Sequence, residues 1–452
     1  MSTGLKNALS SYARATKKVR EVVDAVVDEQ SFVELNAFMG GANELGEYKG
    51  EGVYCGLATI DDRDVAVLAV NPEVFSGGIS RRSADKIAGI AKRACDAGLP
   101  LISLIDSAGA RVMEGVDALD GYGAILSAYC RAYGSVPVIT AVTGKCYGML
   151  TYLSGCSDMF IAVEKAKIST AAPLIISGES GKDVSGANTH YKTSGAVTNV
   201  VKDVTELRAL IVKALSAMCD SVTETEDDPN RTCDELNYAS GVRAVLSAAF
   251  DAGSVTELRG GVASEAVTAF ATLDGIPVAV VGVSGKLTSR GAAKIADFLN
   301  TADNAGMPVV NLVACTGTVA DAGEETGSLI RNVSDLIYTY DNLGVVGVTL
   351  ICGKTSGSGY AIFASKSACD YVVAWEKASV SPMESKSAAY MLYGKEIAKA
   401  KNKSAAERKF AKVYADDNTA MDAAEDGCVD MVIYPAHTRQ YLIATVRSMV
   451  KR

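Results

Sequence analysis

The sequence has few of the residues on which most enzyme sites depend. Its 452 residues include one tryptophan and two histidines, His190 and His437, and aromatic residues make up 6%. Metal sites with two or more histidines are therefore nearly excluded, and a Ser-His-Asp triad would have to use one of these two residues. Because a lone histidine is more often a structural hydrogen-bonding residue, we expect neither a metal ion nor conventional nucleophilic catalysis.

The sequence also lacks the marks of secreted, membrane and nucleic-acid-binding proteins. Its 11 cysteines are scattered singly without a C-x-x-C pair, which fits a reducing compartment better than a disulfide framework or a zinc ribbon. It has no apolar run of about 18 residues and no signal-peptide pattern at its start. A net charge of −9 argues against binding nucleic acid or an anionic membrane. We predict a cytoplasmic globular protein.

One long internal repeat organises the chain. Residues 85–105 and 293–313, 208 residues apart, share a helical pattern, a Gly-x-Pro turn and an apolar run. Two further pairs of segments match in the same order, 162–166 with 374–378 and 58–61 with 271–274. The sequence therefore predicts two copies of one domain. The acidic, proline-containing segment 223–231 has the composition of a linker, so we expect domains at 1–228 and 229–452.

Apolar runs and helical spacing alternate within each copy. The expected strands are 65–70, 101–105 and 136–142, and the expected helices are 83–97, ended by Gly98-Leu99-Pro100, and one near 118–133. This series predicts layered β-β-α units and an α/β fold. From Ser387 onward the chain has a helical composition, and its basic residues Lys399, Lys401 and Lys403 are expected on a solvated helix surface.

Glycine-rich turns recur at equivalent places in the two copies. The first kind lies at 107–111 and 315–318, and the second at 144–149 and 353–359. Backbone N–H groups at strand-to-helix turns lack partners, and two adjoining turns can direct them at one oxygen. Such an oxyanion hole stabilises a carbonyl that becomes an enolate or a tetrahedral anion. Composition alone favours the alternative, in which the glycines only allow helices to pack on strands.

Several segments resemble the carboxyltransferase subunits of biotin-dependent acyl-CoA carboxylases and decarboxylases. Residues 106–115, DSAGARVMEG, are similar to D-S-G-G-A-R-I-Q-E-G of that family. The other matching segments are 28–35, 186–190 followed by Ser194-Gly195, 427–433 and 435–439. The similarity runs in order from about Val19 to Arg447. It implies two tandem crotonase/ClpP-like β-β-α superhelix domains, in a homo-oligomer that relatives commonly build as a trimer of face-to-face dimers.

The resemblance also implies how the turns are used. The acyl-CoA thioester would bind at the first copy and carboxybiotin would enter from the second, at a dimer interface. Carboxybiotin would lose CO2, biotin would take the proton from the acyl α-carbon, and the enolate would attack the CO2. No protein base is needed for this, which agrees with the scarcity of histidine.

The family's motifs assign roles to individual residues by position. The implied oxyanion-hole amides are those of Gly148 and Met149 on the acyl-CoA side and of Gly357, Ser358 and Gly359 on the biotin side. The positions implied to contact the acyl-CoA are Ser107, Ala108, Gly109, Ala110, Arg111 and Ala361, and those implied to contact biotin are Thr316 and Gly317. For Arg111 two roles stay open, binding the CoA phosphates or pinning the turn through a salt bridge.

The sequence departs from the family pattern at four places. The loop that helps form the biotin side keeps only its first glycine, at Gly317. Ala361 stands where relatives have an acidic residue associated with acyl selectivity, and Met149 stands where they have glycine. The loop after Ser169 is shortened. These changes leave the acyl-CoA identity and full biotin-dependent activity open.

The leading hypothesis is the carboxyltransferase component of a biotin-dependent acyl-CoA carboxylase that acts on a short-chain acyl-CoA. The alternatives are the carboxyltransferase subunit of a sodium-pumping methylmalonyl-CoA or glutaconyl-CoA decarboxylase, and an inactive scaffold paralogue. A ClpP-like peptidase is disfavoured because Gly148 stands where its nucleophile would be. The sequence has no M-K-M biotinylation motif. Biotin would therefore be carried by a separate biotin carboxyl carrier protein, served by a biotin carboxylase or membrane decarboxylase subunit, with coenzyme A as part of the substrate.

Overall fold

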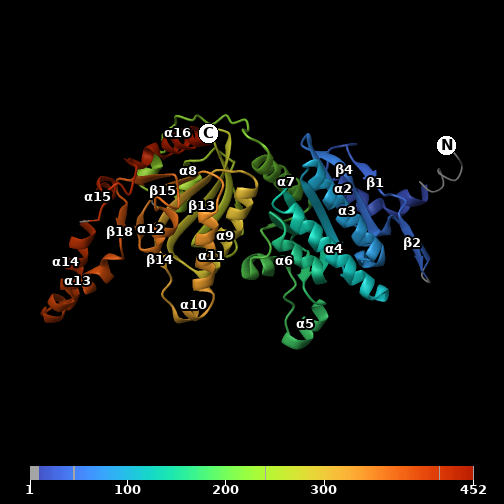
Figure 1. Cartoon of the computed structure of the whole chain (residues 1–452), viewed down its shortest axis with the longest axis horizontal. Helices are drawn as coiled ribbons and strands as arrows, with labels where there is room; N and C mark the ends of the chain where they lie inside the picture. The colour runs from blue at the N-terminus through green and yellow to red at the C-terminus, as the bar shows by residue number, and fades with distance from the viewer. Residues whose placement is uncertain (1–9, 44–45, 240, 417, 451–452) are drawn as a thin grey trace. The chain divides into compact units, whose positions relative to one another are not determined.

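The chain forms two compact units, residues 1–219 and 220–452, coloured blue to green and green to red in Figure 1. The computed structural model describes residues 10–43, 46–239, 241–416 and 418–450. The boundary expected from the sequence, after residue 228, lies nine residues beyond this division. No helix in the described ranges has both the length and the apolar character to cross a bilayer.

Unit 1 contains a mixed sheet with the strand order β1-β4-β5-β6-β7-β8-β10, and β9 pairs with β7. The strands are β1 (Val33–Leu35), β4 (Val53–Ile60), β5 (Arg63–Val70), β6 (Leu101–Ser107), β7 (Val138–Tyr147), β8 (Met159–Val163), β9 (Lys167–Ser169) and β10 (Asn199–Val201). β4 is antiparallel to β1 and β5, and the strands from β5 to β10 are parallel. A small antiparallel pair, β2 (Gly40–Asn43) and β3 (Gly46–Lys49), lies outside this sheet.

Most helices of unit 1 pack on this sheet or on one another, whereas the helix at 173–180 has no buried residue and projects away from the sheet (Figure 1). The helices are α2 (Lys17–Asp24), α3 (Arg81–Ala97), α4 (Val116–Ala132), α5 (Pro173–Ser180), α6 (Ala187–Thr189) and α7 (Val204–Cys219). The helix predicted at 83–97 is α3. Ser80 caps its N-terminus by accepting from the Ser83 N–H, and Gly98, in the left-handed conformation, ends it. Its buried face (Ile87, Ile90) packs into the apolar core of the unit.

Unit 2 repeats this architecture with the strand order β11-β12-β13-β14-β15-β17-β19. The strands are β11 (Thr256–Leu258), β12 (Ala266–Leu273), β13 (Ile276–Leu287), β14 (Val309–Thr318), β15 (Gly347–Ile351), β17 (Tyr371–Trp375) and β19 (Met431–Ile433). The first three are antiparallel and the rest, from β13 on, are parallel. β16 (Lys354–Ser356) and β18 (Ser379–Ser381) form a separate parallel pair. The predicted α/β fold of two β-β-α domains is confirmed.

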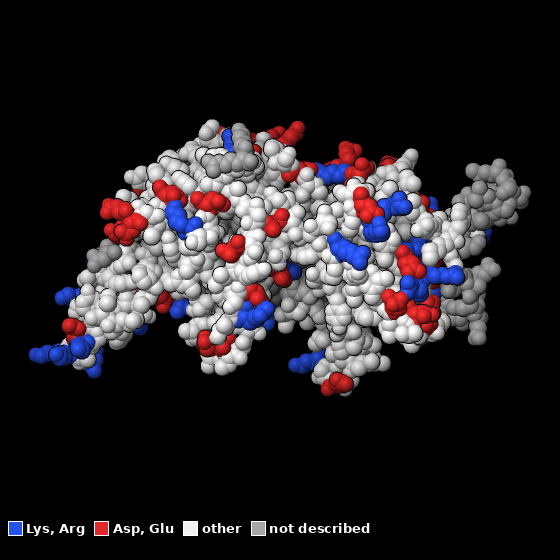
Figure 2. Space-filling model, in the orientation of Figure 1, with Lys and Arg blue, Asp and Glu red and all other residues white. Residues whose placement is uncertain are grey.

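The helices of unit 2 include a projecting pair, α13 and α14, shown in orange-red in Figure 1. The bounds are α8 (Val242–Ala248), α9 (Ser289–Asn304), α10 (Ala322–Thr326), α11 (Leu329–Asp341), α12 (Ser358–Phe363), α13 (Ser385–Lys399), α14 (Lys403–Asp416), α15 (Ala420–Glu425) and α16 (Thr438–Val450). Lys399, Lys401 and Lys403 are exposed, and Figure 2 shows basic side chains gathered at the tip of this pair. The three lysines are solvent-exposed as predicted, but Lys401 lies in the bend between α13 and α14 and not on a helix.

Two of the predicted turns are shorter than expected. Residues 144–147 are not a turn, because β7 continues to Tyr147 by pairing with β9. Likewise β14 continues to Thr318, which pairs with Leu287 of β13. Pairing with strands distant in sequence therefore extends both strands into the glycine-rich segments, and the chain leaves β7 only at Gly148.

Candidate active site

The first turn of unit 1 follows the end of β6 and is held by its own serine. Ser107 Oγ donates to the Gly77 carbonyl oxygen (2.6 Å) and accepts from the Gly109 N–H (3.2 Å). The Ala108 N–H donates to the Ser76 carbonyl (3.0 Å). Gly109 has φ +106°, a conformation that residues with a Cβ rarely adopt. The backbone path at this turn is therefore fixed by hydrogen bonds and requires glycine.

The second turn of unit 1 lies against the first. Gly148 has φ +72° and opens a 3₁₀ segment, η4 (Gly148–Gly155). A Cβ on Gly148 would lie 3.9 Å from Gly109 Cα, and a Cβ on Gly109 would lie 3.4 Å from the Tyr147 carbonyl oxygen. The N–H groups of Gly148 and Met149 stand in the first turn of η4, where a helix offers no acceptor of its own. Two adjoining turns thus meet at this point, as the sequence predicted.

Asp106 joins the strands that lead to these turns. Its Oδ1 accepts from the Lys145 N–H of the neighbouring strand (2.9 Å). A Cβ on Gly144 would collide with the Asp106 carboxylate, so that glycine makes room for the bridge. Asp106 fixes β6 relative to β7 just before each strand reaches its turn. Sequence reasoning missed this role, although Asp106 opens the DSAGAR segment.

Unit 2 has the two equivalent glycine-rich segments, although the first lies in the last residues of β14 and not in a turn. Gly317 has φ +100° and Gly357 has φ +55°, and a Cβ on Gly317 would lie 3.3 Å from Ser358 Oγ. Gly359 packs so closely on the Cys315 carbonyl that it has no room for a side chain. Glycine is therefore required here for conformation and for close packing.

The backbone donors of this second site differ in availability. The Gly357 N–H donates to the Ser381 carbonyl oxygen (3.1 Å). Ser358 and Gly359 begin α12, where first-turn N–H groups have no helical acceptor. Thr316 lies half-buried in β14 beside Gly317. Ala361 is exposed on α12, and its N–H donates to the Gly357 carbonyl (3.1 Å).

Arg111 is buried beneath the first turn of unit 1. It is 3% exposed, and its Nη1 donates to Glu51 Oε1 (2.9 Å) and Glu114 Oε1 (3.0 Å). Its guanidinium carbon lies 4.5 Å from the centroid of the Phe75 ring. Of the two roles that the sequence left open for Arg111, this arrangement matches the salt bridge that holds the turn in place.

Glu51 is a residue that sequence reasoning missed. It is 1% exposed and accepts from Ser80 Oγ (2.6 Å) as well as from Arg111. It thereby connects the N-terminus of α3 to the first turn. The sequence feature that could have indicated its burial is its position between Gly50 and Gly52, because a charged residue between two glycines in a tight turn can be forced inward.

Both histidines make local hydrogen bonds. His190 Nε2 lies 2.9 Å from the Ile168 carbonyl oxygen, and its Nδ1 lies 3.1 Å from Ser194 Oγ. His437 Nδ1 lies 3.0 Å from Gln440 Oε1. These contacts agree with the structural role expected for lone histidines.

The fold and the paired turns define a class of protein before any comparison is made. Two β-β-α domains, each with glycine-rich segments at the ends of parallel strands, form the tandem architecture that the sequence resemblance implied.

Comparison with known families identifies the chain within that class. The family model of the carboxyl transferase domain matches residues 10–452, and the chain belongs to this family. The resemblance inferred from the sequence motifs is thereby confirmed.

Relatives match along nearly the whole chain. The methylmalonyl-CoA carboxyltransferase 12S subunit of Propionibacterium freudenreichii subsp. shermanii is 28% identical, over 98% of this chain and 90% of the relative. The propionyl-CoA carboxylase carboxyltransferase subunit of Haloferax mediterranei is 31% identical, over 97% and 92%. The alpha subunit of Veillonella parvula methylmalonyl-CoA decarboxylase is 29% identical, over 99% and 93%.

A solved structure shows the same fold. The transcarboxylase 12S structure, a hexamer assembly with methylmalonyl-CoA and methylmalonic acid bound, superposes with a TM-score of 0.91 at 27% identity, covering 99% of this chain and 94% of that one. The chain is therefore an enzyme of the biotin-dependent carboxyltransferase family, within which carboxylases and decarboxylases share one architecture.

Proposed function

We propose that this chain is the carboxyltransferase component of a biotin-dependent acyl-CoA carboxylase. It would move a carboxyl group between carboxybiotin, carried on a separate carrier protein, and a short-chain acyl-CoA. The observation that carries the proposal is the adjoining glycine turns of each unit, with Gly109 beside Gly148 and Gly317 beside Ser358. They occur in a chain that aligns over nearly its whole length with relatives named for propionyl-CoA and methylmalonyl-CoA.

Unit 1 takes the acyl-CoA side in this proposal. The N–H groups of Gly148 and Met149 donate to the thioester oxygen and stabilise the negative charge that develops there as the α-carbon becomes an enolate. Residues 107–110 line the acyl group. Removing one N–H donor of this kind lowers the reaction rate by about 10²–10³-fold. The Met149 side chain is partly buried and packs against the apolar core of unit 1.

Unit 2 takes the biotin side, and its residues fit a ureido group. The first-turn N–H groups of Ser358 and Gly359 suit a single carbonyl oxygen. At Gly317 a Cβ would lie 3.3 Å from Ser358 Oγ, so glycine keeps a side chain out of this segment, and Thr316 is its neighbour in the chain. Beside this turn lies a cavity of about 420 Å³ lined by Gly357, Pro382 and Cys428 among others. Biotin, when bound, would supply the carboxyl group. The role of the chain is to hold the ureido oxygen and exclude water.

The decarboxylase direction is the second candidate. The 29% identity to the alpha subunit of Veillonella parvula methylmalonyl-CoA decarboxylase over 99% of this chain favours it. The same pair of oxyanion sites serves both directions, because each stabilises a charge that appears in the forward and the reverse reaction. The partner decides the direction. It would be a biotin carboxylase in one case and a membrane-bound decarboxylase subunit in the other.

A substrate panel tests the proposal. The purified protein is incubated with malonyl-, methylmalonyl- or glutaconyl-CoA and free biotin, and the loss of each CoA ester is followed. We expect biotin-dependent decarboxylation of at least one ester, and the ester that turns over identifies the acyl group, whereas the direction depends on the partner subunit. Measurable binding of the esters without turnover of any of them would contradict the proposal and favour the alternative of an inactive scaffold paralogue.

A further inference from the structure

Two cysteine side chains touch at the surface of unit 1. The Sγ atoms of Cys130 and Cys156 lie 3.2 Å apart. Cys130 is exposed and Cys156 is partly exposed. A disulfide needs a sulfur–sulfur distance of about 2.05 Å, so the two thiols are roughly 1 Å short of bonding. Neither residue belongs to the turns assigned to the substrate.

The two thiols stand at the far ends of the elements that follow those turns. Cys130 lies in the last turn of α4, which begins just after the turn at Ser107–Arg111. Cys156 directly follows η4, which begins at Gly148, and its N–H donates to the Leu153 carbonyl (3.0 Å). A bond between them would connect both elements at the ends opposite the turns.

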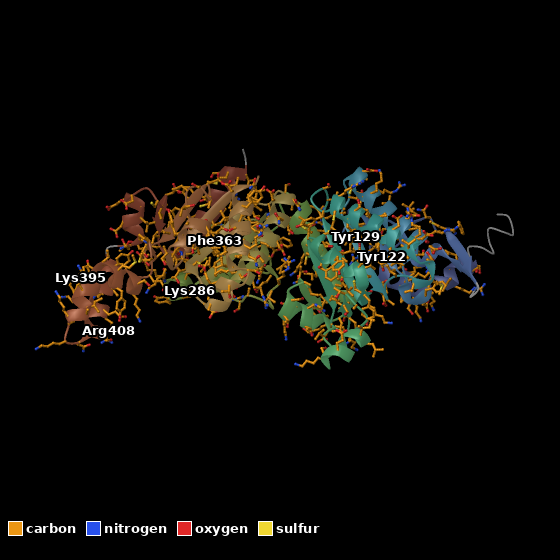
Figure 3. The ribbon with its side chains drawn as sticks, turned by 60° about the horizontal axis from the view of Figure 1, so that its bottom comes forward. Tyr122, Tyr129, Lys286, Phe363, Lys395 and Arg408 are labelled. Carbon is orange, nitrogen blue, oxygen red and sulfur yellow. The ribbon has the colours of Figure 1, made fainter. Side chains whose placement is uncertain are left out.

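One short hydrogen bond links α4 to the middle of β6, and another lies within η4 at its first residue. Next to Cys130, the buried Tyr129 side chain points from α4 to β6, where its hydroxyl lies 2.5 Å from Ser103 Oγ. Figure 3 labels it together with Tyr122, a second buried tyrosine of the same helix. In η4, Thr151 Oγ1 donates to the Gly148 carbonyl (2.7 Å). Because cores are close-packed, a shift of either element is transmitted to the neighbouring groups.

We propose that Cys130 and Cys156 are a site of oxidative modification, at which a hydroperoxide closes an intramolecular disulfide that slows carboxyl transfer. The effect on rate rests on the proposed function, whereas the disulfide itself does not. The bond draws α4 and η4 together by about 1 Å, and a displacement of that size at reacting groups can cost about 10²-fold in rate.

The chemistry balances with one peroxide for each pair of thiols. The exposed Cys130 sulfur attacks the peroxide, the O–O bond breaks, and Cys130 becomes a sulfenic acid while water or an alcohol leaves. Cys156 Sγ then attacks the Cys130 sulfur, the S–O bond breaks, and the hydroxyl leaves as water with the Cys156 proton. Two electrons pass from the thiols to the peroxide. Burial, and then the neighbouring Cys130 thiol, raise the pKa of Cys156 to about 11, so Cys156 is protonated at neutral pH and the more exposed Cys130 is the thiol that meets the peroxide first.

Peptide mapping tests the modification site without any assay of activity. The full-length protein is treated with hydrogen peroxide, its remaining thiols are alkylated, and the digest is analysed by mass spectrometry with and without dithiothreitol. We expect a reducible cross-link between the Cys130 and Cys156 peptides, two hydrogens lighter than the separate thiols, at peroxide levels that leave Cys95 alkylatable. If both cysteines are alkylated as fully as Cys95, the proposal is wrong.

Rate measurements on the same samples test the consequence. Biotin-dependent turnover of methylmalonyl-CoA should fall at least about fivefold in the cross-linked wild type and return with dithiothreitol. Cys130→Ser and Cys156→Ser should lose this sensitivity, and Cys95→Ser, a partly exposed single thiol, should keep it. Full turnover by the cross-linked protein would overturn the effect on rate. If the reduced enzyme turns over no ester at all, the proposed function fails instead, and the peptide map still decides the modification site.

Discussion

Arg111 stands at the end of the first glycine turn, in a position where the sequence left its role open. Its guanidinium is buried against the carboxylates of Glu51 and Glu114 and the ring of Phe75, so it is almost fully shielded from solvent. At the residue scale, this ion pair and the Asp106 bridge have one function in common. They hold backbone amides in position, and no side chain of the turns needs to react.

A double-variant cycle on Glu51 and Arg111 checks the pinning role. Arg111→Met leaves the Glu51 carboxylate buried without its cation, so the free energy of unfolding should fall by about 3–5 kcal/mol. Glu51→Gln combined with Arg111→Met should cost clearly less than the sum of the two single changes, as measured by denaturant unfolding. A stable Arg111→Met variant with a raised KM for acyl-CoA would instead support the phosphate-binding role.

At the scale of elements, the two units share a buried lysine on equivalent helices. Lys86 in α3 and Lys294 in α9 are 208 residues apart, and each is nearly fully buried. The acceptors of their ammonium groups are the carbonyl oxygens of Gly50 and Val53 in unit 1 and of Val262 and Ala266 in unit 2. Each lysine therefore ties a helix to the loop in front of an antiparallel strand.

Lys294 makes the free energy of unfolding depend on pH in the alkaline range. Burial lowers its pKa from 10.5 to about 8. Between these values the unfolded chain holds a proton that the folded chain has lost, so raising the pH stabilises the folded state, by about 3 kcal/mol over the full interval. The unfolding midpoint of the wild type, relative to Lys294→Met, should rise between pH 7.5 and 9.5. Lys399→Met, an exposed control, should give a flat difference, and a flat difference for Lys294→Met would refute the shift.

Patterns among residues close together in sequence predicted the helices and strands well. Contacts between residues far apart in sequence account for the features that those patterns missed. The helix at α3 was found because its spacing, its apolar face and Gly98 are all local. The extension of β7 to Tyr147 depends on β9, which lies some twenty residues further on. The burial of Glu51 depends on Arg111, 60 residues away in sequence. The glycine turns were predictable because the repeat presents them twice, but the occupied Gly357 N–H depends on Ser381 of a distant strand.

At the scale of the whole molecule, the two copies share unusual glycine backbone conformations as well as a fold. Gly77 and Gly285 have φ of +74° and +76°, and Gly109 and Gly317 have +106° and +100°. Each pair is 208 residues apart, although most of the surrounding side chains differ. Conformations that only glycine adopts readily are thus retained in both copies, as expected if both turns present backbone amides to a ligand.

The assembly state is a further prediction at this scale, carried over from a relative. We expect a homo-oligomer built from dimers, up to the hexamer recorded for transcarboxylase 12S. Sedimentation or mass photometry of the purified protein should give a mass near six times the 47.0 kDa of one chain, with dimers as the product of dissociation on dilution. A stable monomer at micromolar concentration would contradict this expectation.

The central claim is that backbone amides of the paired turns perform the catalysis, and Gly148→Pro tests it most directly. Proline removes the N–H and requires φ near −65° where Gly148 has +72°. Gly98→Ala, at φ +67° with open space around it, is the control for backbone strain away from the turns. Biotin-dependent decarboxylation of the best CoA ester in the panel should fall at least about 100-fold in Gly148→Pro, with cooperative unfolding retained, and stay near wild type in Gly98→Ala. Unchanged turnover by Gly148→Pro would contradict the account.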